Sequence, residues 1–175
     1  MKIIAFVGAS ESGKTRLIAR LVPELKRRGL TVAVVKHCGH GFDLGGPDKD
    51  SSKFLVAGAD GVALAGADRT AVVRPLGPRD GLGALARKEF AGIDVVLVEG
   101  GKSDPALRKI EVLRPGLSDG LRTPPDELAA VVADRPVVGA AVPLFSPDRA
   151  GEIADWLIGT TDPGRTPAAR RPRKP

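Results

Sequence analysis

The chain has 175 residues, a mass of 18.2 kDa and a formal net charge of +6, which is the size of one domain. Hydrophobic residues make up 42% and charged residues 27%, so a collagen-like or wholly disordered chain is excluded. No apolar run approaches the roughly 20 residues of a membrane-spanning helix, and residues 1–7 lead into a glycine-rich loop without a cleavage pattern. With Cys38 as its single cysteine, the chain is expected in the reducing cytoplasm, with no signal peptide and no membrane partner.

The positive charge is concentrated at the end of the sequence. Residues 160–175 hold five of the 27 Lys and Arg residues and one of the 21 acidic residues, which leaves a net charge of +2 for residues 1–159. We expect one folded domain at 1–159 and a disordered, basic, proline-rich tail at 160–175. The folded part has few aromatic residues and no basic stripe, so binding to nucleic acid is not expected.

The first elements follow a strand–helix–strand pattern. Lys2–Val7 is a short apolar run before a glycine, which predicts a buried strand. Thr15–Arg28 has apolar residues at helical spacing and a stop at Gly29, and Thr31–Val35 is again typical of a strand. This order predicts a right-handed crossover between parallel strands.

The later elements extend this pattern to a three-layer α/β fold with a mostly parallel sheet. The long polar segment Lys36–Asp50 comes first, and a loop of that length inside a compact domain is usually functional. Asp94–Val98 is continuously apolar after its first residue, which indicates a strand buried on both faces. The other expected elements are helices at Ser51–Gly58, Gly81–Phe90 and Asp148–Ile158, with Trp156 on the apolar face of the last, and strands at Gly61–Ala65, Thr70–Arg74, Lys109–Leu113 and Ala129–Ala133.

A phosphate-loop pattern, G-x-x-x-x-G-K-[ST], lies between the first strand and the first helix, at Gly8–Thr15. In such a loop, backbone N–H groups and the positive end of the helix dipole converge on phosphate oxygens. Lys14 would reach the β- and γ-phosphates, and the Thr15 hydroxyl would ligate Mg²⁺. The sequence therefore predicts a P-loop NTPase domain at residues 1–159, with the nucleotide-binding residues Gly8, Ser10, Glu11, Ser12, Gly13, Lys14, Thr15 and Arg16.

Glu99 is the candidate for a second group at the metal. Ligands of open parallel sheets bind beyond the carboxyl ends of the strands, and Glu99 directly follows an apolar strand-like run. We expect Glu99 to hold the metal or to orient water, and we take Lys14 and Glu99 as the catalytic candidates. Asp94 precedes the same strand and should lie at the opposite edge of the sheet.

Four potential ligands lie within seven residues after the second strand: His37, Cys38, His40 and Asp43. Three interpretations stay open, namely a transition-metal site, a site for an anionic substrate or phosphate, and a purely structural loop. The spacing matches no zinc pattern with a second distant pair, which favours the anion site. Asp50, farther along, is a candidate for a helix N-cap or for a partner of the helix dipole. It could equally hydrogen-bond to a ligating side chain and orient it.

Three segments of the sequence carry a family resemblance: GASESGKT after the first strand, VVKHCGHGFDLGGPDKDS after the second, and DVVLVEGGK followed by KIEVLR. In this combination they are similar to the family of molybdopterin-guanine dinucleotide biosynthesis adapter proteins, MobB. The resemblance implies a P-loop domain that binds GTP with Mg²⁺, hydrolyses it weakly and forms a homodimer. It also implies that the partner is a molybdenum cofactor guanylyltransferase. This enzyme attaches GMP to molybdopterin, and the adapter would assist it.

The resemblance extends to individual positions of the chain. Ser10–Thr15 match the family's GTP-phosphate segment, and further matching positions are Lys36, His37, His40, Asp43 and Asp50 in the polar loop, with Glu99 and Lys102 at the strand end. The loop would meet an anionic pterin (molybdopterin or its guanine dinucleotide), a nucleotide or the partner enzyme. Guanine is usually selected by a carboxylate, and Asp134 after AAVVA is the best-placed candidate, because no N-K-x-D segment is present. GTP rather than ATP therefore rests mostly on the resemblance.

Two other functions stay open. The chain has no glutamine and no evident arginine finger, so we expect slow GTP hydrolysis at most. A P-loop small-molecule kinase with Asp43 or Asp50 as its base is the first alternative, and a metallochaperone GTPase that binds metal through the histidine-rich loop is the second. For the homodimer, the expected strand pair at Gly61–Arg74 could lie at a sheet edge and pair with a second chain.

Overall fold

The computed structural model describes residues 1–42, 49–77, 81–117 and 120–159. Its elements are β1 (Lys2–Val7), α1 (Lys14–Arg27), β2 (Val32–Lys36), α2 (Asp50–Val56), β3 (Val62–Ala65), β4 (Thr70–Val73), α3 (Leu82–Glu89), β5 (Val95–Glu99), β6 (Lys109–Val112), β7 (Leu128–Val132), β8 (Leu144–Phe145) and α4 (Ala150–Gly159). The predicted tail at 160–175 and the candidate Asp43 lie outside the described residues. Within the described ranges, no helix has the length and apolar character needed to cross a membrane.

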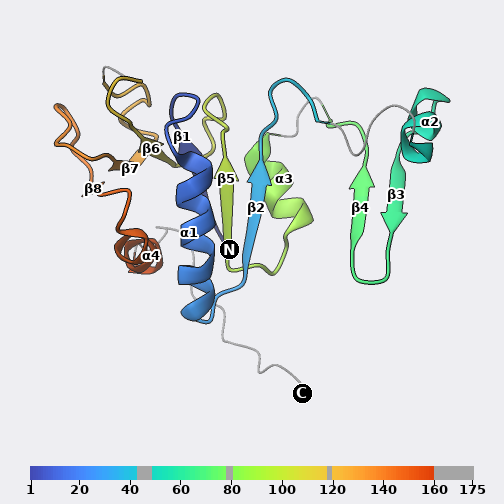
Figure 1. Cartoon of the computed structure of the whole chain (residues 1–175), viewed down its shortest axis with the longest axis horizontal. Coiled ribbons are helices and arrows are strands. Elements are labelled where there is room, and N and C mark those ends of the chain that lie inside the picture. Colours follow the sequence, from blue (N-terminus) through green and yellow to red (C-terminus); the bar gives the residue numbers. More distant parts are fainter. Residues whose placement is uncertain (43–48, 78–80, 118–119, 160–175) are drawn as a thin grey trace.

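Six parallel strands form the main sheet, in the order β2-β5-β1-β6-β7-β8 (Figure 1). The register of β1 on β5 places Phe6 beside Glu99, and the register of β2 on β5 places Lys36 on the other side of Glu99. The carboxyl ends of these three strands therefore share one edge of the sheet. The loop after β1 lies beside the polar residues at the ends of β2 and β5, and the predicted parallel α/β fold is confirmed.

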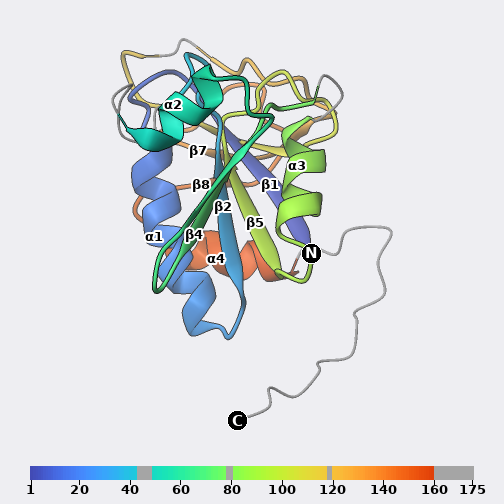
Figure 2. The same cartoon turned by 90° about the vertical axis from the view of Figure 1, so that its right-hand side faces the viewer.

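The apolar core is divided between the two faces of the sheet by alternation along β1. Ile4 and Phe6 are buried against α1 and α4, whereas Ala5 and Val7 are buried against α3. Figure 2 shows α1 and α3 on opposite sides of the strands. The chain therefore has the three layers that the sequence predicts.

The strands β3 and β4 form a separate antiparallel hairpin, with Val62 opposite Val73 and Ala65 opposite Thr70. The hairpin stands apart from the main sheet and lies beside α2 (Figure 1). The strand pair itself is as predicted, but it forms a sheet of its own and does not extend the edge of the main sheet. Its residues are mostly exposed, unlike those of the strands that are covered on both faces.

The short strand β8 is the element that the sequence pattern did not predict. It pairs in parallel with β7, with Val131 beside Leu144 and Val132 beside Phe145. The ring centroid of Phe145 lies 5.5 Å from that of Trp156 on α4, so β8 helps to fix this helix against the sheet. Two residues are too few to show a period, which explains why the pattern missed them.

Candidate functional site

The loop between β1 and α1 adopts backbone conformations that favour glycine. Gly8 has a φ of +145° and Gly13 a φ of +100°. A Cβ atom on Gly8 would lie 2.3 Å from the carbonyl oxygen of Val112, so the loop packs directly on the end of β6. Glu11 has a φ of 60°, the one positive φ of a non-glycine residue in the described part, and Arg114 Nη1 donates to its carbonyl oxygen at 3.2 Å. Backbone strain of this kind is concentrated at ligand-binding sites.

The first turn of α1 offers backbone donors together with the ammonium group of Lys14. Gly13 is the N-cap, and no side chain of the described residues caps this turn. Lys14 Nζ donates to the carbonyl oxygens of Gly8, at 3.2 Å, and Ala9, at 2.6 Å. Burial lowers the pKa of Lys14, and the nearby carboxylate of Glu99 partly opposes this effect. A partly desolvated ammonium beside uncapped N–H groups is suited to bind a phosphate anion.

Thr15 and Glu99 meet at the same edge of the sheet. Thr15 Oγ1 donates to Glu99 Oε1 at 2.6 Å, and Lys36 Nζ lies 3.5 Å from that oxygen. Asp94 lies at the opposite edge, as predicted, and accepts a hydrogen bond from the backbone N–H of Thr31 at 2.8 Å. Hydroxyl and carboxylate oxygens are ligands that Mg²⁺ prefers, together with water and substrate phosphates. The Thr15–Glu99 pair therefore fits a magnesium ion beside the phosphate loop.

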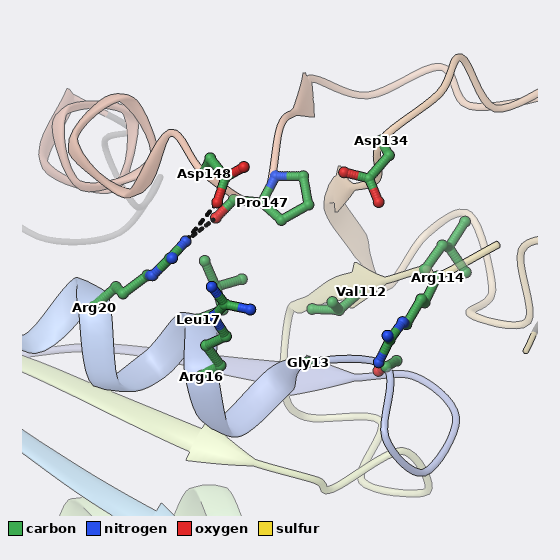
Figure 3. Close-up of a pocket in the computed structure, with 11 residues that line it drawn as sticks. Gly13, Arg16, Leu17, Arg20, Val112, Arg114, Asp134, Pro147 and Asp148 are labelled. Carbon is green, nitrogen blue, oxygen red and sulfur yellow. Dashed lines mark hydrogen bonds and ion pairs between the residues drawn. The ribbon is translucent and has the colours of Figure 1, made fainter.

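A cavity of about 300 Å³, which we call the helix-side cavity, opens beside α1 (Figure 3). Charged residues that line it are Arg16 and Arg20 of α1, Arg114 after β6, Asp134 after β7 and Asp148 before α4. Arg20 Nη1 donates to Asp148 Oδ1 at 2.7 Å, and this bond lowers the pKa of the Asp148 carboxyl. Asp134 lies across the cavity from that pair, and its carboxylate has no hydrogen-bond partner among the described residues (Figure 3).

A second cavity, of about 520 Å³, lies at the ends of β1 and β5, and we call it the strand-end cavity. The phosphate-loop residue Lys14 lines it, together with His37 and Lys102. Arg122 and Glu127, from the segment between β6 and β7, complete its charged lining. The fold thus brings the predicted residues His37 and Lys102 into the same cavity lining as Lys14. The lining also holds two residues that no motif indicated, from the segment between β6 and β7.

The other predicted loop residues do not join this group. Asp50 is the first residue of α2 and Lys49 is its N-cap, so the prediction of Asp50 as N-cap is wrong, although its carboxylate lies in the first turn. Asp50 contacts Lys53 at 3.4 Å, and α2 lies beside the hairpin, away from α1 (Figure 1). His40 is exposed and lines neither cavity. In the part of the chain that is described, no three His, Cys, Asp or Glu side chains come together to hold a metal ion.

Four charged residues shape the site although the sequence predicted no role for them: Lys109, Glu111, Arg114 and Arg122. Lys109 and Glu111 are buried on β6, although charged side chains are usually exposed. Both lie in the KIEVLR segment of the family resemblance, but its alternation with apolar residues is also the pattern of a half-exposed strand, so it predicts no buried charge. Arg114 and Arg122 belong to the irregular segment between β6 and β7, where no period exists to indicate a role.

Comparisons with known proteins agree with the family resemblance of the sequence. The family model described as molybdopterin guanine dinucleotide synthesis protein B (MobB) matches residues 3–134. The molybdopterin-guanine dinucleotide biosynthesis adapter protein of Escherichia coli (strain K12) is 34% identical over 147 residues, which cover 81% of this chain and 79% of that protein. The adapter protein of the same name from Haemophilus influenzae is 32% identical over 156 residues, which cover 89% and 86%. The crystal structure of molybdopterin-guanine biosynthesis protein B is 30% identical, with a TM-score of 0.68 over 89% of this chain and 97% of that one.

Proposed function

The chain belongs to the family of molybdopterin guanine dinucleotide synthesis protein B, MobB, and from this premise we propose that it acts by binding GTP with Mg²⁺. It is an adapter protein in molybdopterin-guanine dinucleotide biosynthesis. The proposed partner is the molybdenum cofactor guanylyltransferase, and molybdopterin or its guanine dinucleotide is the proposed further ligand. The proposed location is the cytoplasm, in keeping with the single cysteine.

The geometry of the phosphate loop is the observation that carries the proposal. The uncapped first turn of α1 would bind phosphate oxygens through backbone N–H groups, and Lys14 would neutralise their charge. Thr15 and Glu99, whose oxygens lie 2.6 Å apart, would hold Mg²⁺. The metal would supply further neutralisation of the phosphate charge.

The helix-side cavity is the proposed site of the guanosine. It begins at Ser12 and Gly13 of the phosphate loop and continues past Arg16, so a nucleoside attached to bound phosphates would enter it. Guanine carries a ring N–H and an amino group side by side, and a carboxylate accepts from both. Asp134 is free to do so, since no described residue occupies its carboxylate.

Hydrolysis is proposed to be slow. Efficient GTPases use a glutamine or an arginine to position water or to stabilise the transferring phosphate. The chain contains no glutamine. The guanidinium of Arg114, which lies near the phosphate loop, already donates a hydrogen bond to the carbonyl oxygen of Glu11. GTP binding would then serve mainly to set the shape or partner affinity of the adapter.

Calorimetric titration of GTP, GDP and ATP in the presence of Mg²⁺ tests the proposal. We expect micromolar binding of GTP, with ATP weaker by at least about tenfold. Lys14→Ala should abolish binding, because it removes the ammonium from the phosphate loop. Lys26→Ala is the matched control, since it removes the same charge at the other end of α1.

Three results bear on the proposal separately. A preference for ATP would contradict it and would favour the kinase alternative. Equal binding by wild type and Lys14→Ala would place the nucleotide elsewhere. An Asp134→Asn variant that binds GTP more weakly but ATP as before would assign base selection to this residue; an unchanged preference for GTP would remove Asp134 from that role.

A further inference from the structure

The strand-end cavity holds cationic groups beyond the phosphate-loop lysine. We propose that it binds the phosphate group of a second small molecule, a phosphate monoester, through Arg122 and Lys102, beside the terminal phosphate of the nucleotide. This inference rests on the proposed function, because it assumes that the nucleotide occupies the phosphate loop and the helix-side cavity.

The two cavities are separate spaces on either side of the phosphate loop. They have no lining residue in common, since the helix-side cavity includes Ser12 and Gly13, whereas the strand-end cavity includes Gly8 and Lys14. A nucleotide with its base in the first cavity leaves most of the second one open. The strand-end cavity is therefore available to a second ligand.

The charge of the strand-end cavity favours an anion. Among the described residues, no hydrogen bond or ion pair occupies the side chains of Arg122 and Lys102. Glu127 is the one carboxylate among the described lining residues, and its charge is already paired with the ammonium of the fully buried Lys109. Lys14 also lines the cavity, but its charge is assigned to the nucleotide phosphates, so Arg122 and Lys102 supply the charge for a second anion. A guanidinium and an ammonium that have no partner among the described residues are groups that typically bind phosphate.

The fold fixes Arg122 at this position through a buried carboxylate. Glu111 on β6 accepts hydrogen bonds from the backbone N–H of Arg122, at 3.0 and 3.1 Å, and from that of Thr123, at 2.9 Å. Glu111 is only 2% exposed, so this attachment is inside the protein. The attachment uses only the backbone of Arg122, and this residue lines the cavity.

The size of the cavity indicates more than a bare phosphate ion. Its volume of about 520 Å³ lies within the range of small-molecule sites, and Val7 and Pro124 provide apolar surface in the same lining. A phosphate ion would fill only part of this space. We therefore take the ligand to be a small organic molecule that carries the phosphate.

The test uses the full chain, saturated with guanosine 5′-(β,γ-imido)triphosphate and Mg²⁺ so that the phosphate loop is occupied. Inorganic phosphate and 4-methylumbelliferyl phosphate are then titrated separately, at an ionic strength held constant with chloride, and ¹H–¹⁵N NMR follows Arg122 Nε and the amides of Gly101 and Lys102. We expect saturable shifts at these groups, with the monoester binding more tightly than inorganic phosphate. The dephosphorylated 4-methylumbelliferone should not bind.

Variants identify the groups that are responsible. Arg122→Ala and Lys102→Ala should each weaken monoester binding by about tenfold or more, and Arg122→Lys should fall between wild type and Arg122→Ala. Lys88→Ala, at the end of α3, removes the same charge outside the cavity and should leave monoester binding unchanged.

Each other outcome overturns a defined part of the argument. If the imidotriphosphate itself does not bind to wild type, the proposed function fails first. If it binds but neither phosphate probe shifts the cavity signals, the second site is wrong. Inorganic phosphate that binds as tightly as the monoester contradicts a small-molecule site. A loss of imidotriphosphate affinity in Arg122→Ala that matches the loss of monoester binding would assign Arg122 to the nucleotide instead.

Discussion

Lys109 and Glu111 are charged residues on a strand that is buried on both faces. The register of β6 on β1 places Lys109 beside Ala5 and Glu111 beside Val7, so both side chains lie on the α3 side of the sheet. Lys109 Nζ donates to the carbonyl oxygens of Asp104, at 2.8 Å, and of Leu107, at 3.1 Å, and it also pairs with a carboxylate. Glu111 accepts from two backbone N–H groups of the segment between β6 and β7. These two charges attach the loops around the strand-end cavity to the sheet.

Glu111→Ala should lower the free energy of unfolding by about 3 kcal/mol, because it leaves buried N–H groups without their charged acceptor. Glu111→Gln should have a smaller effect, since the amide oxygen still accepts. Urea denaturation measures both. Glu152→Ala serves as the control, because its exposed pair with Arg149 should contribute less than about 1 kcal/mol. A Glu111→Ala variant no less stable than Glu152→Ala would contradict the attachment.

Mg²⁺ should raise the affinity for GTP in the wild-type chain. In Glu99→Gln this gain in affinity should be about tenfold smaller. The physical reason is that the amide keeps the shape of the side chain but removes the negative charge beside Thr15 Oγ1. GTP titrations with Mg²⁺ and with EDTA give this gain for each protein. Glu152→Gln is the control for an exposed carboxylate. An equal gain in wild type and Glu99→Gln would remove Glu99 from the metal site.

The residues of the phosphate loop could be predicted because their chemistry is local in sequence. Lys14 and Thr15 belong to one continuous motif, and Glu99 directly follows an apolar strand. Arg122 could not be predicted, because its position depends on Glu111, eleven residues earlier and inside the core. A single sequence does not reveal that a charged strand residue is buried. The residues that bind to this buried charge therefore cannot be predicted either.

At the scale of elements, Arg28 joins the end of α1 to α4. Its Nε donates to Asp155 Oδ1 at 2.7 Å, its Nη1 to Glu24 Oε2 at 2.7 Å, and its Nη2 to the carbonyl oxygen of Gly151 at 3.1 Å. The hydrogen bond from Arg28 lowers the pKa of Asp155, and the same kind of bond lowers the pKa of Glu24. One guanidinium therefore connects two helices that also share the apolar core.

The contribution of Asp155 to stability should depend on pH. Its pKa is lower in the folded chain than in the unfolded chain, so the ionised carboxylate stabilises the fold above the unfolded value of about 4. This stabilisation is lost as the pH falls through the folded pKa. Asp155→Asn should therefore be less stable than wild type at pH 7, and the difference should disappear once the pH is below the folded pKa, as measured by urea denaturation. A difference that persists at the lower pH would point to a cause other than charge.

The sequence predicts elements well where they are long or continuously apolar. The amphipathic pattern of α1 and the apolar run of β5 each lead to bounds within one residue of the observed ones. The strand β8 carries no such pattern, because Leu144–Phe145 is placed by pairing with β7 and by contact with α4. Its existence depends on partners distant in sequence, which local periodicity does not record.

At the scale of the whole molecule, the β3–β4 hairpin stands apart from the main sheet (Figure 1). Val72 on β4 is 67% exposed, and Leu64 on β3 is 40% exposed. On α2, Phe54 and Val56 are also exposed. A two-stranded hairpin alone is marginally stable in water, and exposed apolar residues on such an element are typical of an interface. The local strand pattern could predict the hairpin but not its separation from the sheet, because separation is a property of the complete fold.

A second copy of the chain is the proposed occupant of this surface, in keeping with the homodimer that the family resemblance implies. A symmetric dimer would cover the same hairpin on both copies, so one substitution changes the interface twice. Val72→Glu should therefore convert a dimer of twice 18.2 kDa into a monomer in sedimentation equilibrium at micromolar concentration. Val138→Glu is the control, because Val138 is fully exposed in the segment between β7 and β8. If the wild-type chain is a monomer, the proposed dimer is contradicted. If the Val72→Glu variant is still a dimer, the interface lies elsewhere. In either case the exposed apolar residues of the hairpin would be available to the proposed partner enzyme.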